Sequence, residues 1–157
     1  INSTQFKIGR NENVQFHGRT RTSDAAIYDL LIDRNPSIIV VSGWQDKGYI
    51  LACKRFKRAK PSVKVVAGID DQWTGSLRQR IGQVYYATFY RPLFDFMWVS
   101  GKPQYSYAQK FGYGIDSIIS NLYSADTEVF NSSSGFCKRF VYVGRFVPIK
   151  ALDLLVL

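Results

Sequence analysis

Five short apolar runs recur along the chain, and each of them ends in a glycine or a polar loop. They are SIIVVSG (37–43), VKVVAG (63–68), FDFMWVSG (94–101), DSIISN (116–121) and KRFVYVG (138–144). Consecutive apolar residues over this length are typical of strands that are buried on both faces of a parallel sheet. Parallel neighbours need a crossover connection between them, so these runs constrain the chain to an α/β fold.

Segments with helical spacing separate the apolar runs. They lie within residues 23–36, 47–58, 75–92 and 102–112. Strands and helices that alternate at these lengths predict an open, mostly parallel, Rossmann-like sheet with helices on both faces.

Residues at the ends of these segments fit helix boundaries. Ser23 is a suitable N-cap and Asn35, before a proline, a suitable stop, while Pro103 and Gly112 suit the start and end of another helix. Apolar positions also predict which side of a helix faces the sheet. For the helix within residues 75–92, the predicted inner stripe is Leu77, Ile81, Val84, Tyr85 and Thr88. The predicted outer face of that helix is Arg78, Arg80, Tyr86 and Tyr90.

Polar and aromatic residues gather in the loops that follow the strands, where open α/β sheets bind their ligands. Three of these loops begin with a small residue and a glycine, which lets a ligand approach the backbone closely. A tryptophan beside carboxylates and amides can stack on the C–H face of a sugar while its neighbours bind the hydroxyls. The predicted acceptor or sugar site comprises Gly43, Trp44, Gln45, Asp46, Asp70, Asp71, Trp73, Ser100, Tyr123 and Ser124.

Each of these features also has a structural interpretation. A glycine pair suits a tight turn, a tryptophan can fill the gap between helix and sheet, and Asp70 or Asp71 can accept hydrogen bonds at a helix start. The sequence has one histidine, His17, and no nucleophile–base or phosphate-loop motif. Asp70 is the one residue put forward for catalysis, and neither a metal nor a cofactor is expected.

A second candidate site lies near the end of the sequence. Arg145 follows an apolar run and Gly144, and Lys150 comes in the first turn of a helix that is predicted after Pro148. A helix N-terminus with two cations beside it is suited to binding a diphosphate.

The formal net charge of +9 favours acidic partners, such as a nucleic acid, an anionic membrane surface or a phosphate-bearing substrate. Lys54, Arg55, Lys57 and Arg58 are predicted to lie on one helix, and Arg78, Arg80, Tyr86 and Tyr90 lie on the predicted outer face of another. Both surfaces suit docking on anionic lipid. The alternative is an ordinary solvated helix face. A nucleic-acid interface is less favoured, because no motif for one appears and the strands read as buried on both faces.

The segment VGRFVPIKALDLL (143–155) resembles the Gly-Arg-Leu-x-x-x-Lys-Gly motif that opens the second domain of GT-B glycosyltransferases of family 4. The stretch NLYSADTEVF (121–130) is similar to the loop that ends the first domain of that family, and the resemblance extends over residues 38–157. It implies two Rossmann-like domains around a cleft, one for the acceptor and one for the nucleotide sugar. The implied boundaries are an acceptor-side domain at 1–131, a linker at 132–138, and the first strand and helix of a donor-side domain at 139–157.

By this resemblance, Arg145 and Lys150 bind the donor diphosphate, and the loops at Trp44 and Asp70 face the acceptor. The family commonly has a histidine near the position of Asp70, which this sequence lacks, so the catalytic group stays open. Ala151 stands where a glycine usually follows the lysine. The implied function is retaining transfer of a sugar from a nucleotide-sugar donor to a glycan or lipid-linked acceptor. It would serve cell-surface polysaccharide synthesis in bacteria, in the cytoplasm at the inner face of the membrane.

The family pattern further implies that the chain is a piece of a longer enzyme, inactive alone, whose terminal helix associates with a second copy. Two other functions stay open at this point. One is a basic α/β domain that binds nucleic acid, and the other is a non-catalytic sugar-binding domain.

Overall fold

The computed structural model describes residue 15, residues 17–19 and residues 22–123 of the chain. All of them belong to the first of two units into which the chain divides, Ile1–Ser124. The predicted strand at 138–144, the linker at 132–138 and the donor-side segment at 139–157 lie outside the described residues.

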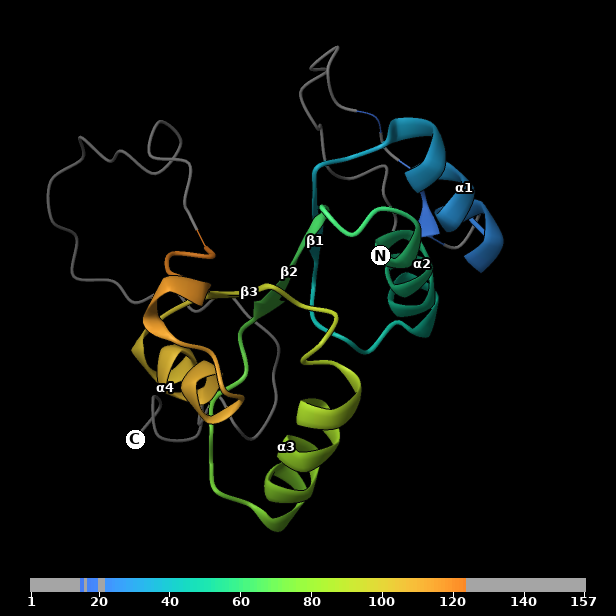
Figure 1. The fold of residues 1–157 in the computed structure, drawn as a ribbon. Helices are drawn as coiled ribbons and strands as arrows, with labels where there is room; N and C mark the ends of the chain where they lie inside the picture. Colours follow the sequence, from blue (N-terminus) through green and yellow to red (C-terminus); the bar gives the residue numbers. More distant parts are fainter. Residues whose placement is uncertain (1–14, 16, 20–21, 124–157) are drawn as a thin grey trace, which may run out of the picture. The chain divides into compact units, whose positions relative to one another are not determined.

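Four parallel strands form one sheet, whose first three strands are labelled in Figure 1. They are β1 (Ile38–Val41), β2 (Lys64–Ile69), β3 (Phe96–Val99) and β4 (Ile118–Ile119). Their order across the sheet is their order along the chain, and the register pairs Val41 with Ala67 and Ile69 with Val99. The predicted open parallel α/β sheet is confirmed.

In the described part of the chain the connecting elements are α1 (Asp24–Arg34), α2 (Lys47–Ala59), α3 (Leu77–Phe89), α4 (Lys102–Lys110) and the short 3-10 helix η3 (Ile115–Ser117). Their predicted boundaries hold. Ser23 caps α1 by accepting a hydrogen bond from the N–H of Ala26 at 3.2 Å, and Asn35 ends that helix in the left-handed conformation. Pro103 lies in the first turn of α4, and Gly112 follows that helix with φ +85°.

One face of the sheet carries the hydrophobic core. There Val65, Ala67 and Met97 pack with Phe56 of α2 and Tyr86 of α3. Because consecutive strands are neighbours, right-handed crossovers place α2, α3 and α4 on this same face. α1 lies against α2 (Figure 1).

The opposite face of the sheet is apolar and partly open. Ile38 and Val40 of β1 are exposed there, while Phe96 and Trp98 of β3 are half-buried. The sequence predicts helices on both faces of the sheet. In the part of the chain that the structure describes, the crossover helices cover only one face.

An aromatic cluster fixes α3 and α4 to the sheet. The buried ring of Tyr86 stacks on Phe111 with centroids 4.1 Å apart, and Trp44 meets it edge-on at 4.8 Å. Its hydroxyl shares a hydrogen bond of 2.8 Å with the hydroxyl of Tyr113. Burial raises the pKa of Tyr86, so its hydroxyl stays protonated. Each such ring pair contributes about 0.5–1.5 kcal/mol beyond its buried area.

The predicted inner stripe of α3 is wrong. Leu77, Ile81, Val84 and Tyr85 are between 53 and 73% exposed, and Tyr86, predicted to face outward, is buried in the core. The helix is apolar on more than one side, so periodicity alone does not select the buried side. The aromatic cluster selects it, because the ring of Tyr86 buries a large area and its hydroxyl finds a partner.

Candidate functional site

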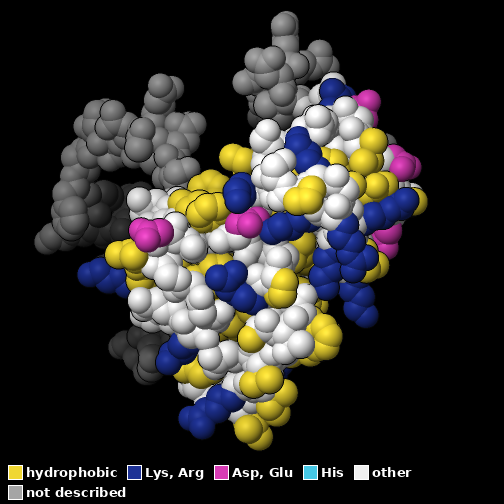
Figure 2. Space-filling model, in the orientation of Figure 1, with side chains coloured by type: hydrophobic (Ala, Val, Ile, Leu, Met, Phe, Trp, Pro, Cys, Tyr) yellow, Lys and Arg dark blue, Asp and Glu magenta, His cyan; other side chains and the backbone are white. Residues whose placement is uncertain are grey.

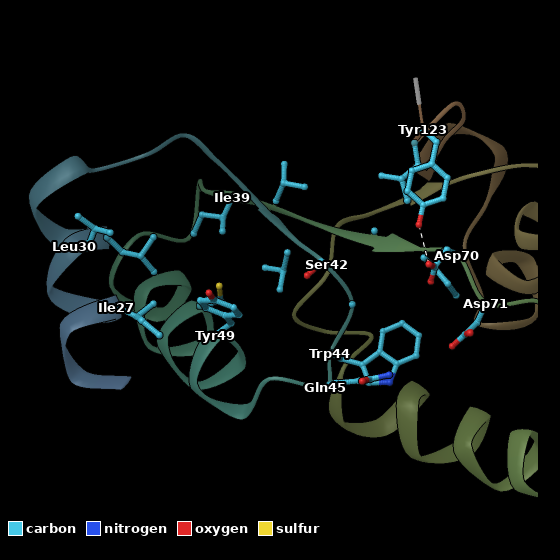
Figure 3. Close-up of a pocket in the computed structure, with 18 residues that line it drawn as sticks. Ile27, Leu30, Ile39, Ser42, Trp44, Gln45, Tyr49, Asp70, Asp71 and Tyr123 are labelled. Atoms are coloured by element: carbon cyan, nitrogen blue, oxygen red, sulfur yellow. Dashed lines mark hydrogen bonds between the residues drawn. The ribbon is translucent and has the colours of Figure 1, made fainter. Parts of the chain in front are cut away.

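A cavity of about 810 Å³ opens at the carboxyl ends of β1 and β2 (Figure 3). Its volume is within the range of about 300–1,000 Å³ that small-molecule sites occupy. Ile27 and Leu30 of α1 and Ile39 of β1 form its apolar part. The predicted site residues that line it are Gly43, Trp44, Gln45, Asp70, Asp71 and Tyr123.

The loop after β1 starts with a tight turn at Gly43. Its φ of +76° lies in the left-handed region that glycine adopts without strain, and its N–H donates to the carbonyl of Val41 at 2.9 Å. The turn sets the ring of Trp44 against Tyr86 and leaves the side chain of Gln45 exposed. Trp44 therefore fills a gap in the core and also forms part of the cavity wall.

The carboxylate of Asp46 is hydrogen-bonded to the start of α2 and to Arg19. Its Oδ1 accepts hydrogen bonds from the N–H groups of Gly48 at 2.9 Å and Tyr49 at 3.3 Å, as the N-cap of α2. Arg19 donates to both carboxylate oxygens, at 2.8 and 3.0 Å, and also to Asp24 at 2.6 Å. The Arg19 hydrogen bond lowers the pKa of Asp46 to about 2. Asp46 thus takes the structural role that a carboxylate at a helix start can have.

Asp70, directly after β2, is held from two sides. Its carboxylate Oδ2 accepts a hydrogen bond from the hydroxyl of Tyr123 at 2.8 Å, the dashed line in Figure 3. Its main-chain carbonyl accepts from the amide of Gln104, on α4, at 2.8 Å. The bond to the carboxylate raises the pKa of Tyr123, which keeps this hydroxyl a donor. Asp71 is exposed and lines the same cavity, and no described residue engages its carboxylate in a hydrogen bond or ion pair.

Gln79, in the first turn of α3, folds the rest of the loop after β2. Its Oε1 accepts from the N–H groups of Thr74 at 2.7 Å and Gly75 at 3.1 Å, and its amide donates to the carbonyl of Gln72 at 2.8 Å. Ser76 caps α3 by accepting from the N–H of Gln79 at 3.3 Å. Because a serine caps this helix, neither carboxylate of the loop is needed at its start.

Three of the predicted site residues do not line the cavity: Asp46, Trp73 and Ser100. The ring of Trp73 packs on Tyr107 with centroids 5.4 Å apart, and the ammonium of Lys110 lies 5.2 Å from its centroid. Trp73 is therefore a packing residue between its loop and α4. Ser124, Arg145 and Lys150 lie outside the described residues.

The four cations of α2 that are predicted to face a membrane have different environments. The ammonium of Lys57 donates to the carboxylate of Asp95 and to the carbonyl of Leu93, both at 2.8 Å. Burial raises the pKa of Asp95, but hydrogen bonds from Lys57 and from the N–H of Val65 outweigh it and leave the pKa below its usual value. Lys57 thus ties α2 to the starts of two strands, and its charge is paired.

The other three cations lie on the surface of α2. The guanidinium of Arg55 is 3.8 Å from the ring centroid of Tyr28, and the ammonium of Lys54 is 5.5 Å from that of Tyr90. Arg58 is exposed. Among the helices that the structure describes, none has the length and apolar content to cross a membrane.

The chain matches no protein-family model, no curated protein and no solved structure. Within residues 15, 17–19 and 22–123, no cluster of three or more His, Cys, Asp or Glu side chains is placed to hold a metal ion. The site is thus defined by its own geometry, as a cavity with an apolar part and a polar end.

Sequence reasoning missed two residues that shape the site. Gln79 could have been found from the sequence, because a serine followed three residues later by a glutamine, as in Ser76 and Gln79, is a capping-box pattern. Arg19 could not have been, since it reaches Asp46 across 27 positions of the sequence.

Proposed function

We propose that the chain is part of a glycosyltransferase that moves a sugar from a nucleotide-sugar donor to a glycan or lipid-linked acceptor, with retention. The proposal places this reaction in cell-surface polysaccharide synthesis, in the cytoplasm at the inner face of the membrane. The observation that carries it is the polar end of the cavity, where Asp70, Asp71, Gln45 and Tyr123 line one space.

The chemistry of that end suits a sugar. A carboxylate can accept hydrogen bonds from two neighbouring hydroxyls, and an amide both donates and accepts. Asp71 supplies a carboxylate free of described partners, while Tyr123 holds Asp70 in place at 2.8 Å. Trp44 adds an aromatic surface for the C–H face of the ring. In this proposal the acceptor sugar binds to Asp71 and Gln45, and Asp70 is the candidate catalytic carboxylate.

The donor half of the proposal rests on the sequence. There Arg145 and Lys150, beside a predicted helix N-terminus, would bind the diphosphate of a nucleotide sugar. No metal or cofactor is part of the proposal, and the nucleotide sugar is a substrate.

Binding of acceptor sugars to the 157-residue chain tests the acceptor half. Saturation-transfer NMR and titration calorimetry with a panel of oligosaccharides should detect binding, and Asp71→Asn should weaken it by about tenfold or more, as expected for a hydrogen bond to a charged group. Asp116→Asn is the matched control, because Asp116 lies in η3, before the amino end of β4. Equal loss in both variants, or no binding of any sugar, would contradict the proposal.

Nucleotide-sugar binding tests the donor half. UDP-, GDP- and ADP-sugars are titrated into the wild-type chain and into Arg145→Ala, which should bind at least about tenfold more weakly because a charged diphosphate contact is lost. Nucleotide-sugar binding that Arg145→Ala leaves unchanged would contradict this half of the proposal. Salt-sensitive binding of RNA in the absence of any sugar binding would favour the nucleic-acid alternative.

A further inference from the structure

The outward face of α3 carries a run of apolar residues that the core leaves uncovered. Leu77, Ile81, Val84, Tyr85 and Phe89 are all at least half exposed. Their spacing of three to four residues places them on one side of the helix, opposite the buried Tyr86. We call these five residues the α3 stripe. Single exposed apolar residues need no explanation, but five in a row along one helix mark an interaction surface.

Cations surround this stripe. Arg78 and Arg80 are exposed in the first turn of α3. At the other end, Phe89 enters a groove of about 490 Å³ whose lining also includes Lys54 and Arg58 of α2. Figure 2 shows hydrophobic side chains at the surface near the lower end of the molecule, where α3 lies, with Lys and Arg side chains beside them.

This combination identifies the chemistry of the partner. α3 contains no acidic residue, and neither does the lining of the groove at its end. An apolar stripe with aromatic residues and flanking Arg and Lys is the pattern of helices that lie in the interface of an anionic bilayer. A protein partner would need a complementary apolar groove with its own acidic rim, whereas an anionic lipid surface supplies both the apolar layer and the negative charge.

We propose that α3 docks the protein on an anionic membrane surface, with the α3 stripe inserted among the lipids and Arg78, Arg80, Lys54 and Arg58 at the phosphate level. Arg78 and Arg80 belong to the surface predicted from the sequence, whereas Tyr86 is buried in the core and Lys57 is paired with Asp95, so neither of these two contributes to it. α3 begins directly after the Asp70–Gly75 loop, so the docked helix brings the candidate site close to the membrane. If the proposed transferase function holds, that position favours a lipid-linked acceptor.

Vesicle co-sedimentation of the 157-residue chain tests the docking. Vesicles of equal parts phosphatidylglycerol and phosphatidylcholine should bind the protein, and vesicles of phosphatidylcholine alone should bind it far more weakly. Ile81→Asp and Val84→Asp should each weaken binding by about tenfold or more. Each replaces an apolar side chain, which is inserted among the lipids in the docked state, with a negative charge that the anionic surface repels. Ile115→Asp is the control, since Ile115 is 74% exposed but lies in η3.

A second variant tests the charges and avoids any question of folding. The double substitution Arg78→Gln/Arg80→Gln should weaken binding to the anionic vesicles by about fivefold per charge, and added salt should reduce the difference from wild type. Circular dichroism should show the same fold for all variants, because every substituted side chain is exposed.

Two outcomes would overturn the proposal. One is unchanged vesicle binding in Ile81→Asp and Val84→Asp, which would place the lipid contact elsewhere. The other is a wild-type dimer in light scattering that Ile81→Asp dissociates and that does not bind vesicles, which would assign the α3 stripe to a second copy. Neither outcome depends on sugar binding, so failure of the docking and failure of the transferase proposal are distinguishable.

Discussion

Helices α2 and α3 each contain 13 residues and each follows a strand of the same sheet, yet they use their apolar residues differently. α2 buries Ile50, Cys53 and Phe56 against the sheet. α3 buries Tyr86 and leaves a stripe of aliphatic and aromatic residues at the surface. An apolar stripe along a helix therefore does not by itself show that this side of the helix packs into the core of its own domain.

The starts of the two helices differ in the same way. Asp46 caps α2 and binds Arg19, so both of its carboxylate oxygens already have hydrogen-bond partners. Ser76 caps α3, and Gln79 folds the loop before it, which leaves Asp70 and Asp71 at the cavity. A carboxylate next to a helix start tends to serve the helix, whereas one several residues earlier is available to a ligand.

The largest difference between the two helices is expected when one phenylalanine of each is replaced by alanine. Phe56→Ala should lower the free energy of unfolding by about 3–5 kcal/mol, because Phe56 is 2% exposed and its removal leaves a cavity. Phe89→Ala should change it by less than about 1 kcal/mol, since Phe89 is 50% exposed. Urea unfolding followed by circular dichroism measures both, and similar losses would mean that the C-terminal end of the α3 stripe is part of the core.

A smaller effect of opposite sign is expected from the glycines. Gly82 lies inside α3 with open space where a Cβ would be, so Gly82→Ala should stabilise the protein by about 0.5–1 kcal/mol. A Cβ at Gly48 in α2 would collide with the side chains of Asp24 and Arg19, so Gly48→Ala should lose that gain and loosen the Arg19 ion pair. The melting temperature should rise for Gly82→Ala and fall for Gly48→Ala. An equal gain in both would show that the α2 contacts carry no stability.

The smallest effect is local and depends on pH. The pKa of Asp46 is lowered to about 2 in the folded protein, so its contribution to stability is present above the usual carboxyl pKa of about 4 and is lost as the pH falls through about 2. Hydrogen exchange should therefore show the amides of Gly48 and Tyr49 losing protection over this range. The amide of Gln79 should not, because its partner Ser76 does not titrate.

Asp46→Asn supplies the control for the pH experiment. Asparagine also caps helices, so this variant should keep protected amides at Gly48 and Tyr49 but remove their dependence on pH. The same pH dependence in the variant would show that Asp46 is not the group responsible.

The candidate site could be predicted in outline from the sequence. The rule that ligands bind beyond the carboxyl ends of parallel strands pointed to the edge of the sheet at which the cavity lies. Gly43, Trp44, Gln45, Asp70, Asp71 and Tyr123 meet there around one cavity. The rule could not separate Asp46 from Asp71, because both are loop carboxylates near a tryptophan. Their difference depends on Arg19, which is remote in sequence and carried no pattern that pointed to either residue.

The α/β class, the strands and the helix boundaries within the described residues could be predicted from the sequence alone. These features depend on short-range physics: consecutive apolar residues for a buried strand, and capping residues and glycines at the ends of a helix. Two features could not be predicted in this way: the side of α3 that faces inward, and the carboxylates that have no partner within the fold. Both depend on contacts between distant residues, the Tyr86–Phe111 and Tyr86–Tyr113 pairs in one case and the Arg19–Asp46 pair in the other, and no local pattern encodes them.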